Sequence, residues 1–191
     1  WDSLVANGAR IINNSWGIGI GEQFAKGGKD PAFAHFDLSD AQAQFDQIKP
    51  LLGTAPGGAY SGAINAARSG VLTIFAAGND YNLNNPDAIS GLAYFVPEIT
   101  PNWLSVAALQ RNPHTNSPNP YVISTFSSRC GYAASFCVSA PGTAIYSSVM
   151  VGTTVDNMTL GWNNKNGTTM SKTHVNSAAA VPSDEIPNLS G

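Results

Sequence analysis

The sequence predicts an α/β fold built around a buried, mostly parallel sheet. Ala9–Trp16 has the pattern of a strand, the segment AYSGAINAARSG that of a helix ending at Gly70, and VLTIFAAGN that of a second strand. A strand, a helix and a wholly apolar strand in succession are typical of a βαβ unit whose sheet is covered on both faces. In such sheets, sites gather beyond the carboxyl ends of the strands. We therefore expect residues 14–17 and 78–79 to meet at one edge.

The other elements follow from local signals along the chain. A short N-terminal helix is expected to end at Gly8, and the glycines of residues 17–21 indicate a loop. Ser39 is expected to cap a helix formed by SDAQAQFDQIKPLL. A strand is expected at Trp103–Leu109, followed by the segments YVISTFS and FCVSAPGTAIYSSV and by a helix through residues 170–180.

Composition narrows the class of protein. The 191 residues suffice for one domain, and the net charge of −3 without runs of like charge gives no support to nucleic-acid binding. Only 11% of the residues are charged, which is common in secreted proteins, and no apolar run reaches the roughly 18 residues that span a bilayer. The first residues show no signal-peptide pattern and begin within a helical pattern.

Two cysteines, Cys130 and Cys137, flank a segment in which Gly131 permits a bend. Their spacing suits a disulfide that closes a hairpin in an oxidising compartment, and two free buried thiols are the alternative. The spacing is not that of a zinc or redox site, and we expect no metal and no cofactor. No acidic cluster has the ligand spacing of a calcium site, and the following scattered residues are interpreted as solvated loop residues: Asp80, Asp87 and Asp156.

Two segments carry residues suited to acyl transfer. Asn79 in FAAGND follows a strand of small residues, and its amide could stabilise an oxyanion, although Gly-Asn-Asp is also a common turn. In NGTTMSKTHV, Thr169 stands near the start of a helix, where free N–H groups favour an oxyanion. Taken alone, each segment is better explained by an ordinary structural role, a turn at Gly-Asn-Asp and a threonine cap at the start of the helix.

Together, and in this order, the motifs resemble those of the subtilases, the subtilisin-like serine proteases. INNSWG is similar to the family's substrate-binding strand, FAAGN to its oxyanion motif, APGTAIYS to the turn before the nucleophile, and NGTTMSKTHV to the nucleophile motif Gly-Thr-Ser-Met-Ala-x-Pro-His-Val. The tryptophan of NNSWG and the cysteine pair resemble autotransporter passenger domains of Gram-negative bacteria. The resemblance implies a three-layer subtilisin-like fold, with residues 1–180 as the C-terminal portion of the catalytic domain and 181–191 as a tail of uncertain structure.

The resemblance also implies roles for individual residues. Thr169 would occupy the nucleophile position and Asn79 would donate to the oxyanion. An extended peptide would pair with the backbone of Ser15, Trp16 and Gly17. One wall of the specificity pocket would be formed by Ala76, Ala77 and Gly78. His174 would be a motif histidine within the helix and not the catalytic base, and a satisfied core residue.

The chain departs from the family pattern in two respects. The Asp-Thr/Ser-Gly and His-Gly-Thr motifs, which precede the substrate-binding strand in subtilases, are absent from these 191 residues. His35 and His114 lack the motif context and are interpreted as loop residues. The second departure is Thr169 itself, whose methyl group restricts χ1 and crowds the reaction site. With the other mismatches around it, Thr169 is compatible with a decayed site, an engineered variant or an uncertainty in the sequence.

These observations favour a serine endopeptidase over a non-catalytic module that binds extended peptides. A plain structural domain would make four ordered motifs a coincidence. Without a base the hydroxyl is a poor nucleophile, so we expect no meaningful proteolysis by this chain alone. Its expected partners are an extended polypeptide and an N-terminal segment carrying the Asp and His, and its expected location is secreted or at the cell surface, in a Gram-negative bacterium.

Overall fold

The computed structural model describes residues 1–20, 35–53, 58–80, 83–114, 116–151 and 158–181. Its central sheet contains four parallel strands in the order β1 (Ile11–Asn14), β2 (Leu72–Ala76), β3 (Trp103–Arg111) and β5 (Cys137–Pro141). A short strand, β4 (Tyr121–Ile123), pairs antiparallel with the end of β3. The mostly parallel α/β sheet expected from the sequence is confirmed.

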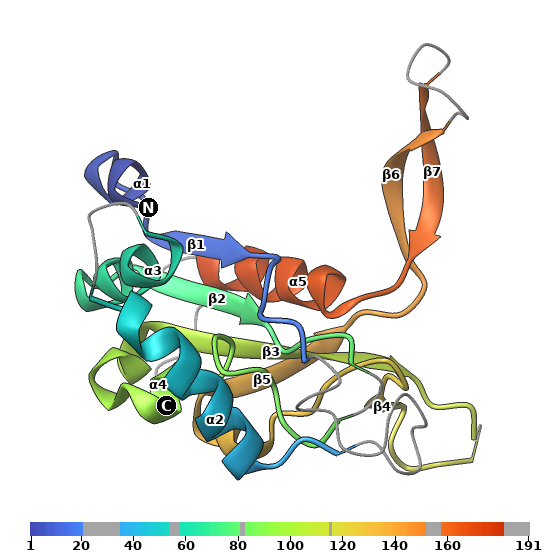
Figure 1. The fold of residues 1–191 in the computed structure, drawn as a ribbon. Coiled ribbons are helices and arrows are strands. Elements are labelled where there is room, and N and C mark those ends of the chain that lie inside the picture. Colours follow the sequence, from blue (N-terminus) through green and yellow to red (C-terminus); the bar gives the residue numbers. More distant parts are fainter. Residues whose placement is uncertain (21–34, 54–57, 81–82, 115, 152–157, 182–191) are drawn as a thin grey trace.

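Helices cover both faces of the sheet, which gives three layers (Figure 1). One face is covered by α5 (Thr168–Ala180), where Val175 packs against a cluster of Ile74, Val106 and Ala140. The opposite face carries α2 (Leu38–Ile48), α3 (Ala59–Arg68) and α4 (Leu92–Phe95). Phe75 and Trp103 stack there in the main core, with ring centroids 4.8 Å apart. Burial on both faces explains why the central strands β2 and β3 are mostly apolar.

Helix ends follow the local signals with one exception. α1 (Asp2–Ala6) ends shortly before Gly8 and α3 ends shortly before Gly70, and both glycines have positive φ angles, +81° and +84°. The expected cap of α2 is wrong, because Asp37 and not Ser39 occupies the N-cap position. The Asp37 carboxylate accepts hydrogen bonds from the N–H groups of Ser39 and Asp40, and Asp40 accepts one from the N–H of Asp37. A carboxylate placed two residues earlier satisfies two free N–H groups at once.

Strand register places the expected functional segments side by side. Asn14 at the end of β1 is the partner of Phe75 in β2, and Phe75 is the partner of Ser105 in β3. Residues 15–20 and 77–80 therefore leave the same edge of the sheet. This agrees with the meeting of strand ends expected from the sequence.

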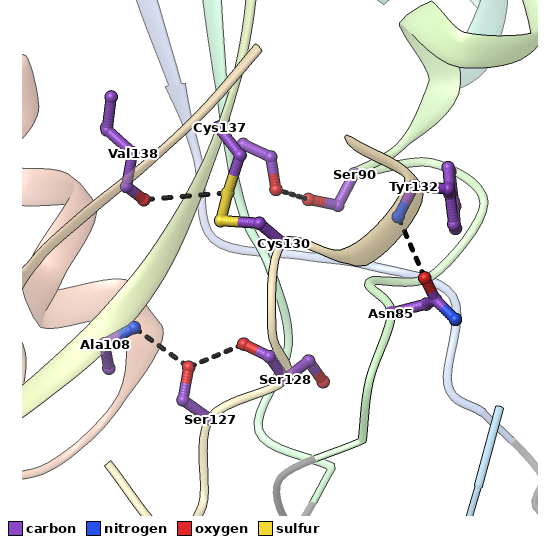
Figure 2. Close-up of a disulfide and its surroundings, with 10 residues drawn as sticks. Asn85, Ser90, Ala108, Ser127, Ser128, Cys130, Tyr132, Cys137 and Val138 are labelled. Carbon is purple, nitrogen blue, oxygen red and sulfur yellow. Dashed lines mark hydrogen bonds between the residues drawn. A yellow bond between two sulfur atoms is a disulfide. The ribbon is translucent and has the colours of Figure 1, made fainter. Parts of the chain in front are cut away.

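Cys130 and Cys137 form a disulfide, with Cα atoms 5.8 Å apart (Figure 2). The segment between them is a 3-10 helix, η3 (Gly131–Phe136), and not the expected hairpin. Gly131 has φ +44° and permits the bend, while Phe136 and Ala133 are buried. Because β5 begins at Cys137, the disulfide fixes the start of that strand relative to η3.

Three further features were not expected from the sequence. The segment between β2 and β3 forms α4 and a 3-10 helix, η2 (Pro97–Asn102), and α2 continues into another, η1 (Lys49–Leu51). β6 (Ile145–Val151) and β7 (Thr159–Lys165) form an antiparallel pair that projects away from the three layers (Figure 1).

Within the described ranges, no helix is both long and apolar enough to cross a bilayer.

The disulfide gives a testable prediction for stability. Replacing both cysteines by serine releases a closed loop of sequence separation 7, so the free energy of unfolding should fall by about 2–3 kcal/mol through the gain in entropy of the unfolded chain. Urea unfolding of the double variant and of the reduced wild-type protein measures the loss. Equal stability of oxidised wild type and double variant would contradict a stabilising role.

Candidate functional site

A pocket of about 190 Å³ lies where the carboxyl ends of β1 and β2 meet the N-terminus of α5. It brings together seven of the eight residues to which the sequence assigned a role in binding or catalysis: Ser15, Trp16, Gly17, Ala76, Gly78, Asn79 and Thr169. The other lining residues are Ile18, Gly19, Asp80, Asp87 and Thr168. Ala77, expected in the pocket wall, does not line it; it is fully buried and its N–H donates to Val106 of β3.

The Asn79 side chain joins the end of β2 to the start of α5. Its Oδ1 accepts hydrogen bonds from the Thr168 N–H at 2.9 Å and from the Thr168 hydroxyl at 3.0 Å. A backbone N–H only donates, so this contact fixes which end of the amide faces Thr168. The Nδ2 group is thereby left on the other side, facing Gly167, and it remains a donor for a ligand.

Gly167 lies between two potential donors to a ligand. A Cβ placed on Gly167 would be 3.7 Å from Asn79 Nδ2 and 3.7 Å from the backbone nitrogen of Thr169. The φ angle of Gly167 is +156°, which side-chain-bearing residues rarely adopt. Thr169 is the second residue of α5, so its N–H belongs to the first turn, where N–H groups lack intrahelical partners. Two donors therefore flank one small, open position.

The hydroxyl groups of the α5 segment differ in their surroundings. Thr169 is half-buried at the pocket, whereas Ser171 is fully buried and its Oγ has no hydrogen-bond partner among the described residues. Two positions along a helix turn the side chain by roughly 200°, which explains why the two hydroxyl groups point in different directions. His174 is exposed, so its expected place in the core is wrong, although its Nδ1 lies 3.1 Å from the carbonyl oxygen of Pro141. No described histidine or carboxylate contacts the Thr169 hydroxyl.

Lys172 is a buried cation that the sequence did not indicate. Its side chain is 1% exposed, and Nζ donates to Oδ1 of Asn13 on β1 at 2.7 Å. Burial lowers the pKa of Lys172 to about 8. The helical pattern of α5 places Lys172 on the face that packs on the sheet, which is the only signal that could have suggested its burial. The bond gives a third link between α5 and the strand ends.

Asp87 also contradicts its expected place in solvent. It is 3% exposed, and its carboxylate accepts hydrogen bonds from the N–H groups of Ile18, Ile89 and Ser90, at 2.9, 3.0 and 2.7 Å. Burial, with a smaller contribution from the charge of Asp80, raises the pKa of Asp87 to about 7. The bond to Ile18 holds the segment after β1 in place. Asp156, interpreted in the same way from the sequence, lies outside the described residues.

The loop that carries Asp87 is held by the disulfide region. Tyr132, two residues after Cys130, donates its N–H to Oδ1 of Asn85 and its hydroxyl to the carbonyl oxygen of Asp87, both at 2.9 Å (the former drawn in Figure 2). Burial raises the pKa of the Tyr132 hydroxyl, which therefore remains a donor. The hydrogen bonds of Tyr132 thus connect the loop that carries Asp87 to the segment closed by the disulfide.

A larger groove of about 930 Å³ lies elsewhere, between α1, the beginnings of β1 and β2, and α5. Its lining is mostly small and aliphatic, and Arg10 is its one charged residue. Ser69 and Asn176 are its other polar side chains, and no carboxylate lines it. No group of three or more His, Cys, Asp or Glu side chains suited to a metal ion occurs in the described part of the chain. The residues suited to catalysis therefore gather in the 190 Å³ pocket.

Comparison with known proteins agrees with the motifs. The sequence pattern of the Subtilase family matches residues 1–191. An extracellular serine protease of Serratia marcescens is 33% identical over 99% of this chain and 20% of its own length, and a second one is 34% identical over 78% and 15%. The chain thus spans about a fifth or less of these relatives.

Solved structures agree on the fold. The protease domain of PatA matches with a TM-score of 0.54 and 20% identity, over 93% of this chain and 45% of that one. The prenylagaramide maturation protease PagA matches with a TM-score of 0.53 and 22% identity, over 94% and 45%. At this identity the likeness concerns the fold alone, which is subtilisin-like.

Lys172 gives a pH-dependent prediction. Replacing it by methionine should raise the free energy of unfolding near pH 7 by about 1–3 kcal/mol, because a buried ammonium is exchanged for an apolar side chain of similar length. The folded-state pKa of about 8 lies below the unfolded value of 10.5, so the unfolded chain binds more protons between these values. Wild type therefore gains stability as the pH rises through this window, and the variant lacks that gain.

Urea unfolding at pH 7, 8.5 and 10 measures the difference between Lys172→Met and wild type, which should shrink as the pH rises. Lys165→Met, at an exposed position of β7, is the matched control and should show a small difference at every pH. A Lys172→Met difference that does not change with pH would contradict the assignment of a buried ammonium.

Proposed function

Because the chain belongs to the subtilase family, we propose that it supplies the substrate strand, the oxyanion donor and the nucleophile position of a serine endopeptidase. The observation that carries the proposal is the convergence of these three elements on one pocket. Residues 15–17, Asn79 and Thr169 come from segments up to 154 positions apart, yet they share a lining of twelve residues. Such a pocket suits nucleophilic acyl transfer on an extended peptide.

Peptide binding would use the backbone beyond β1. Within the described residues β1 pairs with β2 alone, so its other edge offers free backbone groups, and Ser15, Trp16 and Gly17 continue from it along the pocket. An extended peptide adds to such an edge through main-chain hydrogen bonds. The Trp16 ring forms T-shaped contacts with Phe75 and Tyr60, which supports a rigid position for this segment.

Asn79 and Thr169 would stabilise the negative charge that develops on the oxygen of the substrate carbonyl group. The Nδ2 group of Asn79 and the N–H of Thr169 flank Gly167, and Thr168 keeps the amide from turning. Donors that are fixed before the reaction stabilise an oxyanion without the cost of reorientation. Removal of one such donor in related chemistry lowers kcat by about 10²–10³-fold.

The general base would come from an N-terminal segment carrying the Asp and His motifs. No base contacts Thr169 among the described residues, and neither motif occurs in the sequence. Relatives several times longer than this chain are consistent with further protease segments. By itself the chain should bind peptides and hydrolyse none, since a hydroxyl without a base is a poor nucleophile.

A second candidate function is a peptide-binding module without catalysis. Thr169 favours it, because the threonine methyl group restricts χ1 where base and substrate must meet. The two candidate functions differ in whether replacing Thr169 by serine produces turnover when a base is present. Both candidates share the peptide-binding pocket.

We further infer secretion or display at the cell surface, as in an autotransporter passenger domain of a Gram-negative bacterium. The Cys130–Cys137 disulfide requires an oxidising compartment. Two relatives are named extracellular serine proteases, and their source, Serratia marcescens, is consistent with this location.

The proposal is tested by peptide hydrolysis and fluorophosphonate labelling of two proteins: the 191-residue chain, and a version extended by a segment with both motifs. We expect no turnover from the chain alone. In the extended protein, Thr169→Ser should raise turnover at least about tenfold, because serine removes the methyl group. Thr169→Ala should abolish turnover and labelling while leaving peptide affinity unchanged.

Two outcomes would contradict parts of the proposal. Turnover by the isolated chain that Thr169→Ala abolishes would mean that its base lies within these residues and not on an N-terminal segment. Absence of labelling in the extended Thr169→Ser protein, with peptide binding retained, would favour the non-catalytic module instead.

A further inference from the structure

One face of the β6–β7 pair is largely apolar, uncharged and exposed. In an antiparallel pair, cross-strand partners and every second residue along each strand share a face. The register therefore gathers six side chains, which we call the apolar face: Tyr146, Ser148, Met150, Leu160, Trp162 and Asn164. Its four large apolar members are 55–86% exposed. Lys165, the one charged residue of the two strands, belongs to the opposite face.

Such a face is unusual for a surface in contact with water. The other exposed large apolar residues of the described chain, apart from Met158 beside β7, come one each from different segments, as on most monomers. Here they adjoin one another on a pair of strands that projects away from the three layers (Figure 1). A two-stranded ribbon is at best marginally stable alone in water. These features indicate that a partner covers the apolar face.

The base of the β6–β7 pair is held in a fixed direction by hydrogen bonds. The Ala144 N–H donates to Oδ1 of Asn166 at 2.7 Å, and the Gly167 N–H donates to the carbonyl oxygen of Gly142 at 2.9 Å. These bonds join the segment before β6 to the segment after β7. A ribbon held in this way loses less conformational entropy when its apolar face binds a partner.

The apolar face is complementary to a second copy of itself. Near the core, the rings of Tyr146 and Trp162 stack with centroids 5.7 Å apart, whereas Met150 and Leu160 pair farther along the strands. A two-fold axis across the ribbon would place the aromatic half of each copy on the aliphatic half of the other. Methionine sulfur packs favourably on aromatic rings, and no charge would meet a like charge.

The size of the apolar face also suits a second copy. Its four large apolar side chains expose about 600 Å² in each copy, so that two copies would bury about 1,200 Å². Specific protein interfaces bury about 1,200–2,000 Å². Two such ribbons in face-to-face contact would form a small sandwich with an apolar layer between them. A surface of anionic lipid is disfavoured as the partner, because the apolar face carries no cation.

We propose that the apolar face is a dimer interface, in which the β6–β7 pairs of two copies of this chain pack face to face around a two-fold axis. The partner is a second copy because the face is uncharged, self-complementary and large enough for a specific contact. The proposed catalytic function does not depend on this association. Ser148 is the middle residue of β6, so it would lie close to Ser148 of the second copy.

A first test measures the oligomeric state by sedimentation velocity over a series of protein concentrations. We expect wild type to pass from one to two copies of the 19.9 kDa chain, with a Kd in the micromolar range that interfaces of this size permit. Leu160→Lys should raise this Kd at least about tenfold, because an unpaired ammonium would be buried in the interface. Leu51→Lys, the same change at an exposed leucine of η1, is the control and should dimerise as wild type does.

A second test identifies the face that makes the contact. Both native cysteines form the disulfide, so an introduced cysteine is the one free thiol. A short bis-maleimide reagent should cross-link two copies of Ser148→Cys and leave Ser147→Cys, on the opposite face of β6, as a single chain on a denaturing gel. Because both variants alter only a small hydroxyl side chain, this comparison does not depend on the folding of Leu160→Lys.

Three outcomes would overturn the proposal. The first is a wild type that stays monomeric at millimolar concentration. The second is a dimer that persists in Leu160→Lys, or equal cross-linking of Ser147→Cys and Ser148→Cys, because the contact would then lie elsewhere or along the strand edges. The third is binding of monomeric wild type to vesicles of neutral phosphatidylcholine that Leu160→Lys abolishes, which would assign the apolar face to a lipid surface.

Discussion

The whole site depends on two hydrogen bonds to one amide oxygen. Oδ1 of Asn79 accepts both from Thr168, a residue 89 positions later in the chain. They hold the start of α5 against the end of β2, and they direct Nδ2 toward Gly167 and the pocket. Because this amide is held on one side by donors, it has a single orientation in which it donates to a ligand. The small residues around it leave the donated proton accessible.

Other polar contacts also hold the pocket together. They join elements whose relative positions the apolar core alone would not fix. Lys172 ties α5 to Asn13 on β1, and Asp87 ties the loop before α4 to Ile18. Tyr132 extends the second connection to the disulfide region. The three-layer core brings the strand ends together, and these contacts determine their exact spacing. Each of them includes a buried or half-buried polar group that has a hydrogen-bond partner in another element.

Much of this arrangement follows from local pattern and strand topology. The apolar run of residues 71–77 predicts a buried parallel strand, and parallel strands end at one edge, so Asn79 and residues 15–17 had to be neighbours. Glycines 8 and 70 mark helix ends because their positive φ angles require no side chain. These features depend on the spacing of apolar residues and on backbone sterics. Both can be judged from the sequence before the fold is known.

Other features depend on partners distant in sequence and could not be predicted. Asp87 has the sequence context of a solvated loop, and its burial arises from N–H groups of Ile18, Ile89 and Ser90 that only the fold brings together. Lys172 is buried because Asn13 meets it across the sheet. The β6–β7 pair was missed since its alternating, exposed residues bury no apolar face of their own.

We infer above all that an extended peptide binds across these strand ends, with a carbonyl oxygen toward Asn79. A crystal structure of the chain with a bound peptide tests it most directly. We predict main-chain hydrogen bonds between the peptide and residues 15–17, and a peptide carbonyl oxygen within about 3 Å of both Asn79 Nδ2 and the Thr169 nitrogen. A peptide bound instead in the groove between α1, β1 and α5, or with no carbonyl facing Asn79, would contradict the account.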